Sequence, residues 1–174
     1  MGKILILYQS KYGATKRYAG WLAEELGGDL LETKKARLEV VLPYDTIIFG
    51  GGIYASGIAG IGFLKRHYRQ LGDKKLAVFA VGASPYDETA IKALRKRNLR
   101  ELADIPLFYC RGAWREETMT WIDRLLCNGL KRMVARKDPA DYEPWEEALM
   151  QAGTDCDWTD RGNIKPIVEW LQNS

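Results

Sequence analysis

The sequence has little cysteine and almost no histidine, and both shortages restrict what the protein can be. Its three cysteines, Cys110, Cys127 and Cys156, are odd in number, widely spaced and without a C-x-x-C pair. This excludes a disulfide framework and predicts reduced, buried thiols in a cytoplasmic protein. The single histidine, His67, lies among charged residues, so we expect a surface position and not a base or metal ligand. Residues 155–157 have no companion histidines or cysteines at ligand spacing, and we expect no metal site.

The chain also lacks a long apolar run of the kind that crosses a membrane. Residues 46–64 carry no charge over nineteen positions, but six of them are glycines, three of these consecutive. Such a composition is typical of a buried strand followed by a glycine-rich loop, and it excludes a lipid-facing helix. We expect no leader peptide, because the strand pattern begins at Lys3. With 174 residues, 47% of them hydrophobic, and no repeats, one domain over residues 1–174 is expected.

What the sequence does contain is an alternation of short apolar strands with helix-period patterns. Apolar runs without alternation indicate strands that are covered on both faces. Because parallel strands need right-handed crossovers, the pattern predicts a doubly wound α/β fold with a five-stranded parallel sheet. Pro106 near the start of the last strand suits a sheet edge. The predicted strands span residues 3–8, 29–33, 45–50, 76–82 and 105–110, and the predicted helices 15–27, 60–71, 87–100, 118–135, 144–150 and 164–171.

The loop between the first strand and the first helix carries the clearest chemical signal. Hydroxyls at Ser10 and Thr15, a glycine at position 13 and the amides of a helix N-terminus are what a phosphate group needs. The cations Lys11 and Lys16 add attraction. The alternative is an ordinary strand-to-helix turn that is capped by Ser10.

Two other loops are expected to lie beside this one. Ligands of doubly wound sheets bind outside the carboxyl ends of the strands, where the strand order reverses. The loops after the first, third and fourth strands, residues 10–16, 51–58 and 82–87, should therefore converge. The first loop has a single glycine, which excludes the G-x-G-x-x-G of nicotinamide-binding domains. The ends of the first and third strands have no acidic cluster, which excludes a phosphoacceptor receiver domain.

Residues 2–112 resemble the flavodoxins. The resemblance rests on Ser10-x-x-Gly13-x-Thr15 directly after the first strand and on the two later loops. Lys11 and Lys16 depart from the neutral loop that is usual in that family. The resemblance implies a flavodoxin-like strand order of 2-1-3-4-5 and FMN as the cofactor. FMN is expected in place of FAD, because the loop is a monophosphate cradle without a pyrophosphate fingerprint.

A closer resemblance is to the flavodoxin-fold, menaquinone-dependent protoporphyrinogen oxidases. It rests on the phosphate loop and on Gly112-Ala113-Trp114, the run Trp121 to Leu126 and Asp157-Trp158. It implies a helical insertion over about residues 113–160, before the last helix. It also implies an enzyme of haem biosynthesis that passes electrons from a porphyrinogen-like substrate to a quinone through the flavin N5, without a catalytic residue of the protein.

The alternative function is a flavodoxin-like electron carrier that holds FMN, serves a redox protein and turns over no substrate of its own. The net charge of +3 favours the enzyme, because carriers of this family are typically acidic. The extra helical segment also favours it, since it would obstruct an exposed flavin edge or build a pocket beside it.

The residues predicted to bind the cofactor lie in four loops. A peptide between Gly52 and Gly57 could turn its carbonyl toward the flavin N5, and Tyr54 or Tyr86 either stacks on the ring or packs half-buried under a loop. Arg111 and Arg115 are candidates to meet substrate carboxylates, the alternative being solvated loop charges. The predicted cofactor residues are Ser10, Lys11, Tyr12, Gly13, Ala14 and Thr15; Gly52, Ile53, Tyr54 and Ala55; Ser84, Pro85 and Tyr86; and Gly112, Ala113 and Trp114.

Two other charged groups are assigned structural roles. Asp123 and Arg124 could clamp a substrate, but an acid and a base on one helix more often form an ion pair, which we expect here. The basic residues between Lys92 and Arg100 have no aromatic residues among them. We therefore expect a solvated helix face and no nucleic-acid partner.

The helix predicted over residues 118–135 has an apolar side and a basic end. We expect the apolar side to pack on the protein's own core. The alternative is weak peripheral contact with an anionic membrane at its inner face, where a quinone would be found. The apolar residues are Met119, Ile122, Leu125, Leu126, Leu130, Met133 and Val134, and the basic ones are Lys131, Arg132, Arg136 and Lys137.

Overall fold

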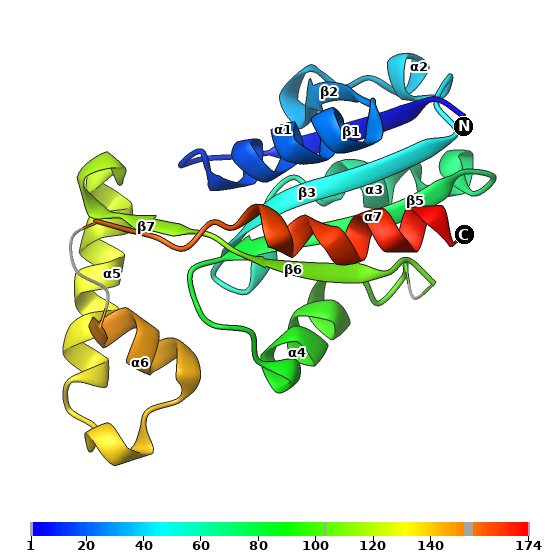
Figure 1. Ribbon diagram of the computed structural model, residues 1–174. Helices are drawn as coiled ribbons and strands as arrows, with labels where there is room; N and C mark the ends of the chain where they lie inside the picture. The colour runs from blue at the N-terminus through cyan, green and yellow to red at the C-terminus, as the bar shows by residue number, and fades with distance from the viewer. Residues whose placement is uncertain (1, 103, 152–154, 174) are drawn as a thin grey trace.

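A parallel sheet is the centre of the computed structural model, which describes residues 2–102, 104–151 and 155–173 (Figure 1). All neighbouring strands along the order β2-β1-β3-β5-β6 run parallel. Counted over these five strands, this is the predicted order 2-1-3-4-5, and the doubly wound fold is confirmed. Pro106 directly precedes β6, which is an edge strand as expected. The strands are β1 (Ile4–Gln9), β2 (Asp29–Glu32), β3 (Thr46–Tyr54), β5 (Lys75–Gly82) and β6 (Leu107–Arg111).

Helices cover both faces of this sheet. One face packs against α1 (Ala14–Leu26) and α7 (Lys165–Gln172), which lie in front of the sheet in Figure 1. The other face packs against α2 (Leu38–Val41), α3 (Gly62–His67) and α4 (Glu88–Asn98). Because strand side chains alternate between faces, each buried strand contributes to both cores.

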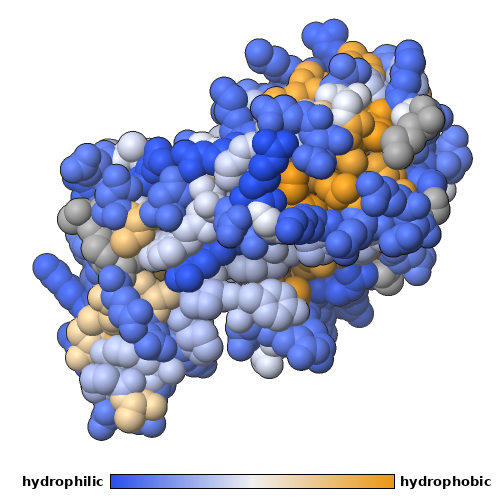
Figure 2. Space-filling view, viewed as in Figure 1, coloured by the Kyte–Doolittle hydropathy of each residue, from blue (hydrophilic) through white to orange (hydrophobic). Residues whose placement is uncertain are grey.

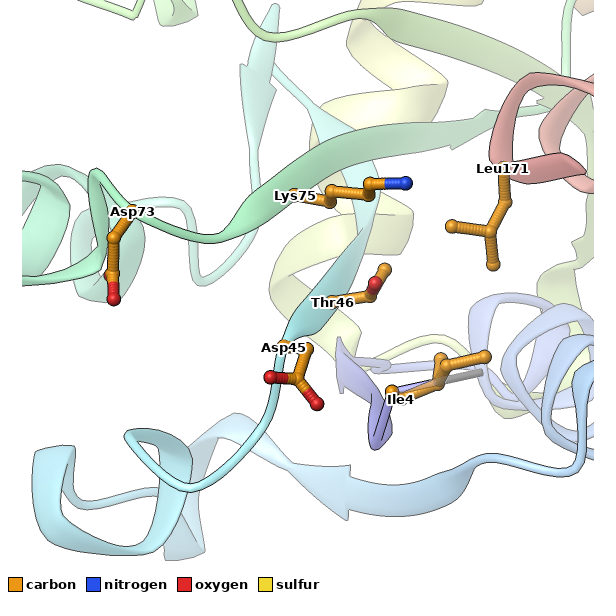
Figure 3. Close-up of a pocket in the computed structure, with 7 residues that line it drawn as sticks. Ile4, Asp45, Thr46, Asp73, Lys75 and Leu171 are labelled. Atoms are coloured by element: carbon orange, nitrogen blue, oxygen red, sulfur yellow. The ribbon is translucent and has the colours of Figure 1, made fainter. Parts of the chain in front are cut away.

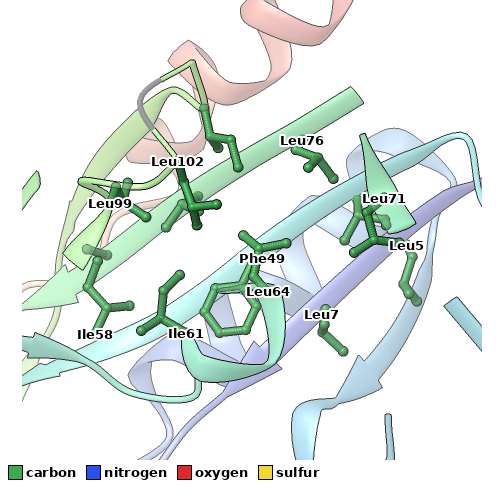
Figure 4. Close-up of a cluster of buried hydrophobic side chains, with 14 of the residues drawn as sticks. Leu5, Leu7, Phe49, Ile58, Ile61, Leu64, Leu71, Leu76, Leu99 and Leu102 are labelled. Carbon is green, nitrogen blue, oxygen red and sulfur yellow. The ribbon is translucent and has the colours of Figure 1, made fainter. Parts of the chain in front are cut away.

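The two cores are tightly filled. Ile48 of β3 belongs to the core under α1 and α7, and the next residue, Phe49, belongs to the opposite core. Figure 4 shows Phe49 among leucines from β1 and α3, including Leu64. Gly50 follows in β3, and a Cβ at this position would lie 2.0 Å from Cζ of Phe79 on the neighbouring strand. Gly50 is therefore required by the close approach of the Phe79 ring.

The charge-free residues 46–64 form β3, the short strand β4 (Gly57–Ile58) and the start of α3. The exclusion of a lipid-facing helix there is confirmed, and no helix in the described ranges is long and apolar enough to cross a bilayer. β4 pairs antiparallel with β3 and was not predicted, nor was α2. Short 3-10 helices add to these elements at Thr33–Lys35, Tyr68–Leu71, Glu116–Thr118, Pro139–Asp141 and Arg161–Ile164.

Residues 113–160, called the insertion from here on, lie beyond the edge strand β6. Their elements are β7 (Ala113–Arg115), α5 (Trp121–Val134), α6 (Pro144–Gln151) and β8 (Asp155–Asp157), while residues 152–154 fall outside the described ranges. β7 and β8 pair antiparallel into a ribbon that leads away from β6, with α5 and α6 at its far end (Figure 1). The predicted helix over 118–135 begins at Trp121, where the Thr120 hydroxyl caps it by accepting the amide of Asp123 at 3.3 Å.

The burial of three predicted features differs from expectation. The apolar side of α5 does not pack on the protein's core: it is exposed, and Val134 is the one buried residue of this helix. The prediction of core packing was wrong, because helical periodicity identifies a face without saying what covers it.

His67 is half-buried against Phe63, with ring centroids 4.8 Å apart, so the expected surface position was wrong in part. All three cysteines are free, with Cys110 buried and the other two half-buried.

Candidate functional site

The loop between β1 and α1 leaves the start of a helix open to a ligand. Gly13 is the N-cap residue of α1 with φ of 93°, and no side chain caps the helix. The Ser10 hydroxyl accepts the amide of Gly13 at 3.1 Å, so Ser10 braces the loop and does not cap the first turn. That turn also holds no acidic residue, and its amides and dipole stay available for an anion. The Thr15 side chain lies in the same turn and is 3% exposed.

Three further loops meet this one at the carboxyl edge of the sheet. Gly112, after β6, approaches the phosphate loop, because a Cβ there would lie 3.6 Å from Cβ of Ala14. The Gly112 amide donates to the carbonyl of Gly82 at 2.7 Å. A Cβ at Gly82 would in turn lie 3.1 Å from Cδ1 of Ile53. The glycines at these strand ends therefore allow the four loops to approach each other closely.

Tyrosines line this edge from several loops. Tyr54 lies at the end of β3 with its ring 6.2 Å from that of Tyr12, in a T-shaped arrangement. Tyr86 is 65% exposed and lies 6.2 Å from the ring of Tyr109. The Tyr109 hydroxyl donates to the carbonyl of Ser84 at 2.5 Å, and burial raises the pKa of this phenol. Tyr86 is thus not packed under its loop, and its ring is accessible to a flat ligand.

The hairpin between β3 and β4 is strained and is held by a residue that the sequence did not point to. Ala55 and Ser56 have φ of 46° and 63°, a left-handed conformation that costs L-residues on the order of 1–2 kcal/mol each. The buried Asn98 of α4 accepts the Ile58 amide at 2.9 Å and donates to the Ser56 carbonyl at 2.9 Å. These bonds fix the hairpin in the position where the sequence predicts cofactor contact.

Asp123 of α5 joins the insertion to the phosphate loop. Its carboxylate accepts hydrogen bonds from the Lys11 ammonium and from the Tyr12 hydroxyl. These two bonds hold the pKa of Asp123 below its ordinary value, and the bond to Asp123 raises the pKa of Lys11. Arg124 donates instead to the Glu116 carbonyl at 2.9 Å. The predicted Asp123–Arg124 ion pair was wrong, because the two side chains turn to different partners.

A second polar contact joins the insertion to α1. Asp157 of β8 accepts from the Arg17 guanidinium at 2.6 Å and from the Arg115 guanidinium at 3.0 Å. Burial raises the pKa of Asp157, but the bonds from Thr159 and Arg17 outweigh it and hold the pKa below its ordinary value. Two carboxylates of the insertion therefore bind cations at or next to the phosphate loop.

Three predicted residues at and after the end of β6 make contacts within the protein. The Arg111 guanidinium donates to the Ala83 carbonyl at 3.1 Å and lies 4.4 Å from the ring centre of Trp158. Trp114 lies in the ribbon, with the Lys131 ammonium 5.5 Å from its ring centre. Arg111 and Arg115 are thus half-buried and paired within the protein, and their contact with a substrate stays a prediction.

Tyr18 of α1 is a structural residue of this edge that no sequence motif marks. Its hydroxyl donates to the Arg111 carbonyl at 2.6 Å and accepts from the amide of Asp160 at 3.0 Å and from Asn163 at 2.8 Å. The ring itself is fully buried in the core under α1. Tyr18 therefore holds α1 against the residues just before and at the end of the insertion, where the chain leaves the sheet and returns to it.

A hollow of about 300 Å³ lies at the opposite, amino end of the sheet (Figure 3). Its lining includes Ile4, Thr46 and Lys75, the first residues of β1, β3 and β5. Figure 2 shows apolar surface near both chain ends, between α1 and α7. None of the predicted cofactor residues lines this hollow, so the chemistry predicted from the sequence belongs to the carboxyl edge.

Residues 5–142 match the model of a protein family described as the flavodoxin domain. The chain belongs to the flavodoxin domain family. This membership confirms FMN as the expected cofactor. The phosphate loop fits it, since the uncapped start of α1 and the Thr15 hydroxyl are donors that suit a monophosphate dianion. None of the curated proteins matches the sequence.

Solved structures similar to this flavodoxin domain are distant in sequence. A flavoprotein from Bacteroides eggerthii is 19% identical over 79% of this chain and 100% of its own, with a TM-score of 0.49. A WrbA-like flavodoxin from Agrobacterium tumefaciens is 17% identical over 71% of this chain and 88% of its own, with a TM-score of 0.49. A flavoprotein from Lactobacillus acidophilus, solved in complex with FMN, is 20% identical over 64% of this chain and 93% of its own, with a TM-score of 0.41.

Proposed function

We propose that this flavodoxin domain is an FMN-dependent oxidoreductase that moves electrons in pairs from a porphyrinogen-like substrate to a quinone. The observation that carries the proposal is the contact of Asp123 with Lys11 and Tyr12. It fastens a helical insertion beside the phosphate loop, at the edge where the cofactor loops meet. An insertion in this position could form one side of a substrate pocket, whereas an electron carrier needs an exposed flavin edge.

FMN supplies a flavin ring that accepts an electron pair from one substrate and delivers it to another. The protein's own part is to hold and orient. Thr15 and the amides of the first turn of α1 would hold the phosphate. The hairpin fixed by Asn98 would hold Gly52 and Tyr54 beside the ring. Arg115, at the entrance of the insertion, is our candidate to orient a substrate carboxylate.

The second candidate function is an electron carrier for a redox protein. Two observations favour it: membership of the flavodoxin domain family, and Tyr86, which is largely exposed at the carboxyl edge. The net charge of +3 argues against it, because an acidic surface would steer a carrier to basic partners. The two functions differ in whether the isolated protein turns over a small substrate.

Cofactor identity is the first test. Protein purified without added flavin should show a flavin absorbance spectrum, and the cofactor released by heat should chromatograph as FMN. Release of FAD, or an apoprotein that ignores FMN in a titration, would contradict both functions.

Turnover is the second test. With FMN bound, anaerobic protein should oxidise protoporphyrinogen IX when menaquinone is present and should be idle when either is omitted. Arg115→Gln should raise KM with kcat largely retained, while Arg161→Gln, which breaks ion pairs with Glu24 and Glu25, should change neither. FMN binding without turnover, combined with fast one-electron reduction by a flavodoxin reductase, would establish the carrier.

A further inference from the structure

A second hollow, of about 560 Å³, lies between α3 and α4. The inner sides of these helices are buried, with Leu64 and Leu94 in the core, whereas every residue that lines the hollow is exposed. None of the predicted cofactor residues takes part in it. The lining consists of Lys65 of α3, Ala93, Lys96 and Arg97 of α4, and Arg100 and Glu101, which follow α4. We call this hollow the α3–α4 groove.

The helical period of α4 brings the lining cations together. Lys96 and Arg97 lie three and four positions after Ala93, the spacings of one helix side. Arg100 continues this side, three positions after Arg97. The buried Leu94 fixes the other side of α4 against the core, so the cations cannot turn inward. Ala93 has the smallest side chain of the lining and leaves room between the longer ones.

The protein does not balance the charge of the groove. In the part of the chain that the structure describes, the side chains of the four lining cations form no hydrogen bond, ion pair or ring contact. Lys92 of the same helix, by contrast, pairs with Glu88 at 2.7 Å. Glu101 is the one carboxylate among four lining cations, which leaves the lining with a net charge of +3. Because like charges repel at such spacings, an anion in the groove would relieve this repulsion.

Positive charge is also concentrated on this side of the molecule. The elements α3, Tyr68–Leu71 and α4 hold seven basic residues and one acidic residue, whereas the insertion holds eleven acidic residues and six basic ones. The negative end of a helix dipole equals about half an elementary charge, so the ends of α3 and α4 offset only a fraction of this excess. The groove therefore lies where the field of the protein favours an anion most.

We propose that the α3–α4 groove binds a compact phosphate polyanion, such as a short polyphosphate. The guanidinium forks of Arg97 and Arg100 match phosphate oxygens, and the two lysines add point charges. None of the lining residues is aromatic, so the groove has no platform on which a nucleic-acid base could stack. A hollow suits a small ligand better than the surface of a protein partner. This site goes beyond the proposed reaction and does not depend on it.

Calorimetric titration of the FMN-loaded protein with tripolyphosphate tests the proposal. Because FMN fills the phosphate loop, the heat reports on a different site. One tripolyphosphate should bind per chain at low salt, and its affinity should fall as the salt concentration rises. Orthophosphate carries fewer charges and should bind about tenfold more weakly.

Charge variants locate the site. Lys96→Gln with Arg97→Gln should weaken tripolyphosphate binding by about tenfold or more, because two charge-assisted contacts are lost. The matched control is Arg66→Gln with Lys92→Gln, which removes the same charge from exposed positions of the same helices outside the groove. It should change the affinity by less than about twofold, since solvent and salt screen distant charges. An unchanged FMN spectrum verifies that each variant is folded.

A shape variant separates a built site from a diffuse positive field. Ala93→Leu fills the groove without changing the charge, and leucine is nearly as good a helix former as alanine. It should weaken tripolyphosphate binding by about fivefold or more, because the ligand no longer fits between the two helices. Glu101→Gln should act in the opposite direction and tighten binding, because it removes the carboxylate of the lining.

Four results would overturn the proposal. The first is the absence of heat with tripolyphosphate at low salt. The second is equal weakening by the groove pair and the control pair, and the third is unchanged affinity of Ala93→Leu. The fourth is tighter binding of polyglutamate than of tripolyphosphate, since the groove would then be a docking surface for an acidic protein.

Discussion

The sheet and the insertion of this flavodoxin domain are held in place by different forces. The sheet is fixed by buried apolar side chains on both faces, with Phe49 and Phe79 fully excluded from solvent. The insertion contacts the phosphate loop and α1 through two carboxylates, Asp123 and Asp157, and turns its apolar residues outward. The sheet should therefore be sensitive to shape, and the insertion to charge.

Adding one methyl group should damage the sheet most. Gly50→Ala places a Cβ 2.0 Å from Cζ of Phe79 and should lower the free energy of unfolding by about 3 kcal/mol. Gly20→Ala in α1 is the control, because its Cβ meets nothing within 4 Å, and it should raise stability by up to ~1 kcal/mol. Urea unfolding measures both. Equal stability of the two variants would show that the sheet is not packed as described.

Removing one hydroxyl should weaken the cofactor site without harming either region. Thr15→Ala should cost about 2 kcal/mol of FMN binding, roughly thirtyfold in Kd, because it removes a donor to a charged phosphate. Thr46→Ala is the matched control, since Thr46 is similarly buried at 5% exposure but lies at the amino end of the sheet. Titration of the apoproteins with FMN should separate them. Equal losses in both would point to general destabilisation.

Acid should loosen the insertion before the sheet. The folded-state pKa values of Asp123, Asp157 and Glu146 lie below their ordinary values, the last because Lys137 bonds to it. Their stabilisation is complete above about pH 4, near the unfolded pKa, and is lost as pH falls through the folded pKa. Hydrogen exchange should show that α5 amides lose protection at a higher pH than those of β3. Simultaneous loss would contradict the difference between the regions.

Neutralising one carboxylate should have the smallest global effect. Asp123→Asn breaks an exposed ion pair and should lower the free energy of unfolding by less than about 1 kcal/mol. It should nevertheless speed hydrogen exchange at the start of α5. Asp29→Asn, which neutralises a carboxylate that accepts from the Tyr44 hydroxyl far from the insertion, should leave α5 exchange unchanged. If α5 exchange is unaffected by Asp123→Asn, this contact does not hold the helix.

The parallel sheet and the phosphate loop were predictable because their signals are local. Apolar runs without alternation, such as residues 45–50, indicate strands that are buried on both faces. The phosphate-loop residues Ser10, Gly13 and Thr15 lie within six positions of each other. The β3–β4 hairpin was missed because its turn uses Ala55 and Ser56 in a conformation that such residues rarely adopt.

The contacts of the insertion could not be predicted from sequence patterns. Asp123 and Lys11 are separated by 112 positions, and nothing in their local surroundings marks them as partners. The ribbon strands β7 and β8 have three residues each, too few for a period to show. The exposure of the apolar side of α5 was also missed, because the periodicity of a helix is the same whether protein or solvent covers its apolar side.

The β7–β8 ribbon brings the first and last residues of the insertion together beside β6. Ala113 pairs with Asp157, and the next residue, Trp158, donates its amide to the carbonyl of Gly112 at 3.1 Å. The chain thus leaves and re-enters the sheet at neighbouring positions. A short turn joining residues 112 and 158 would leave the five-stranded sheet without the insertion. A different insertion could be placed between the same two residues without any strand changing its register.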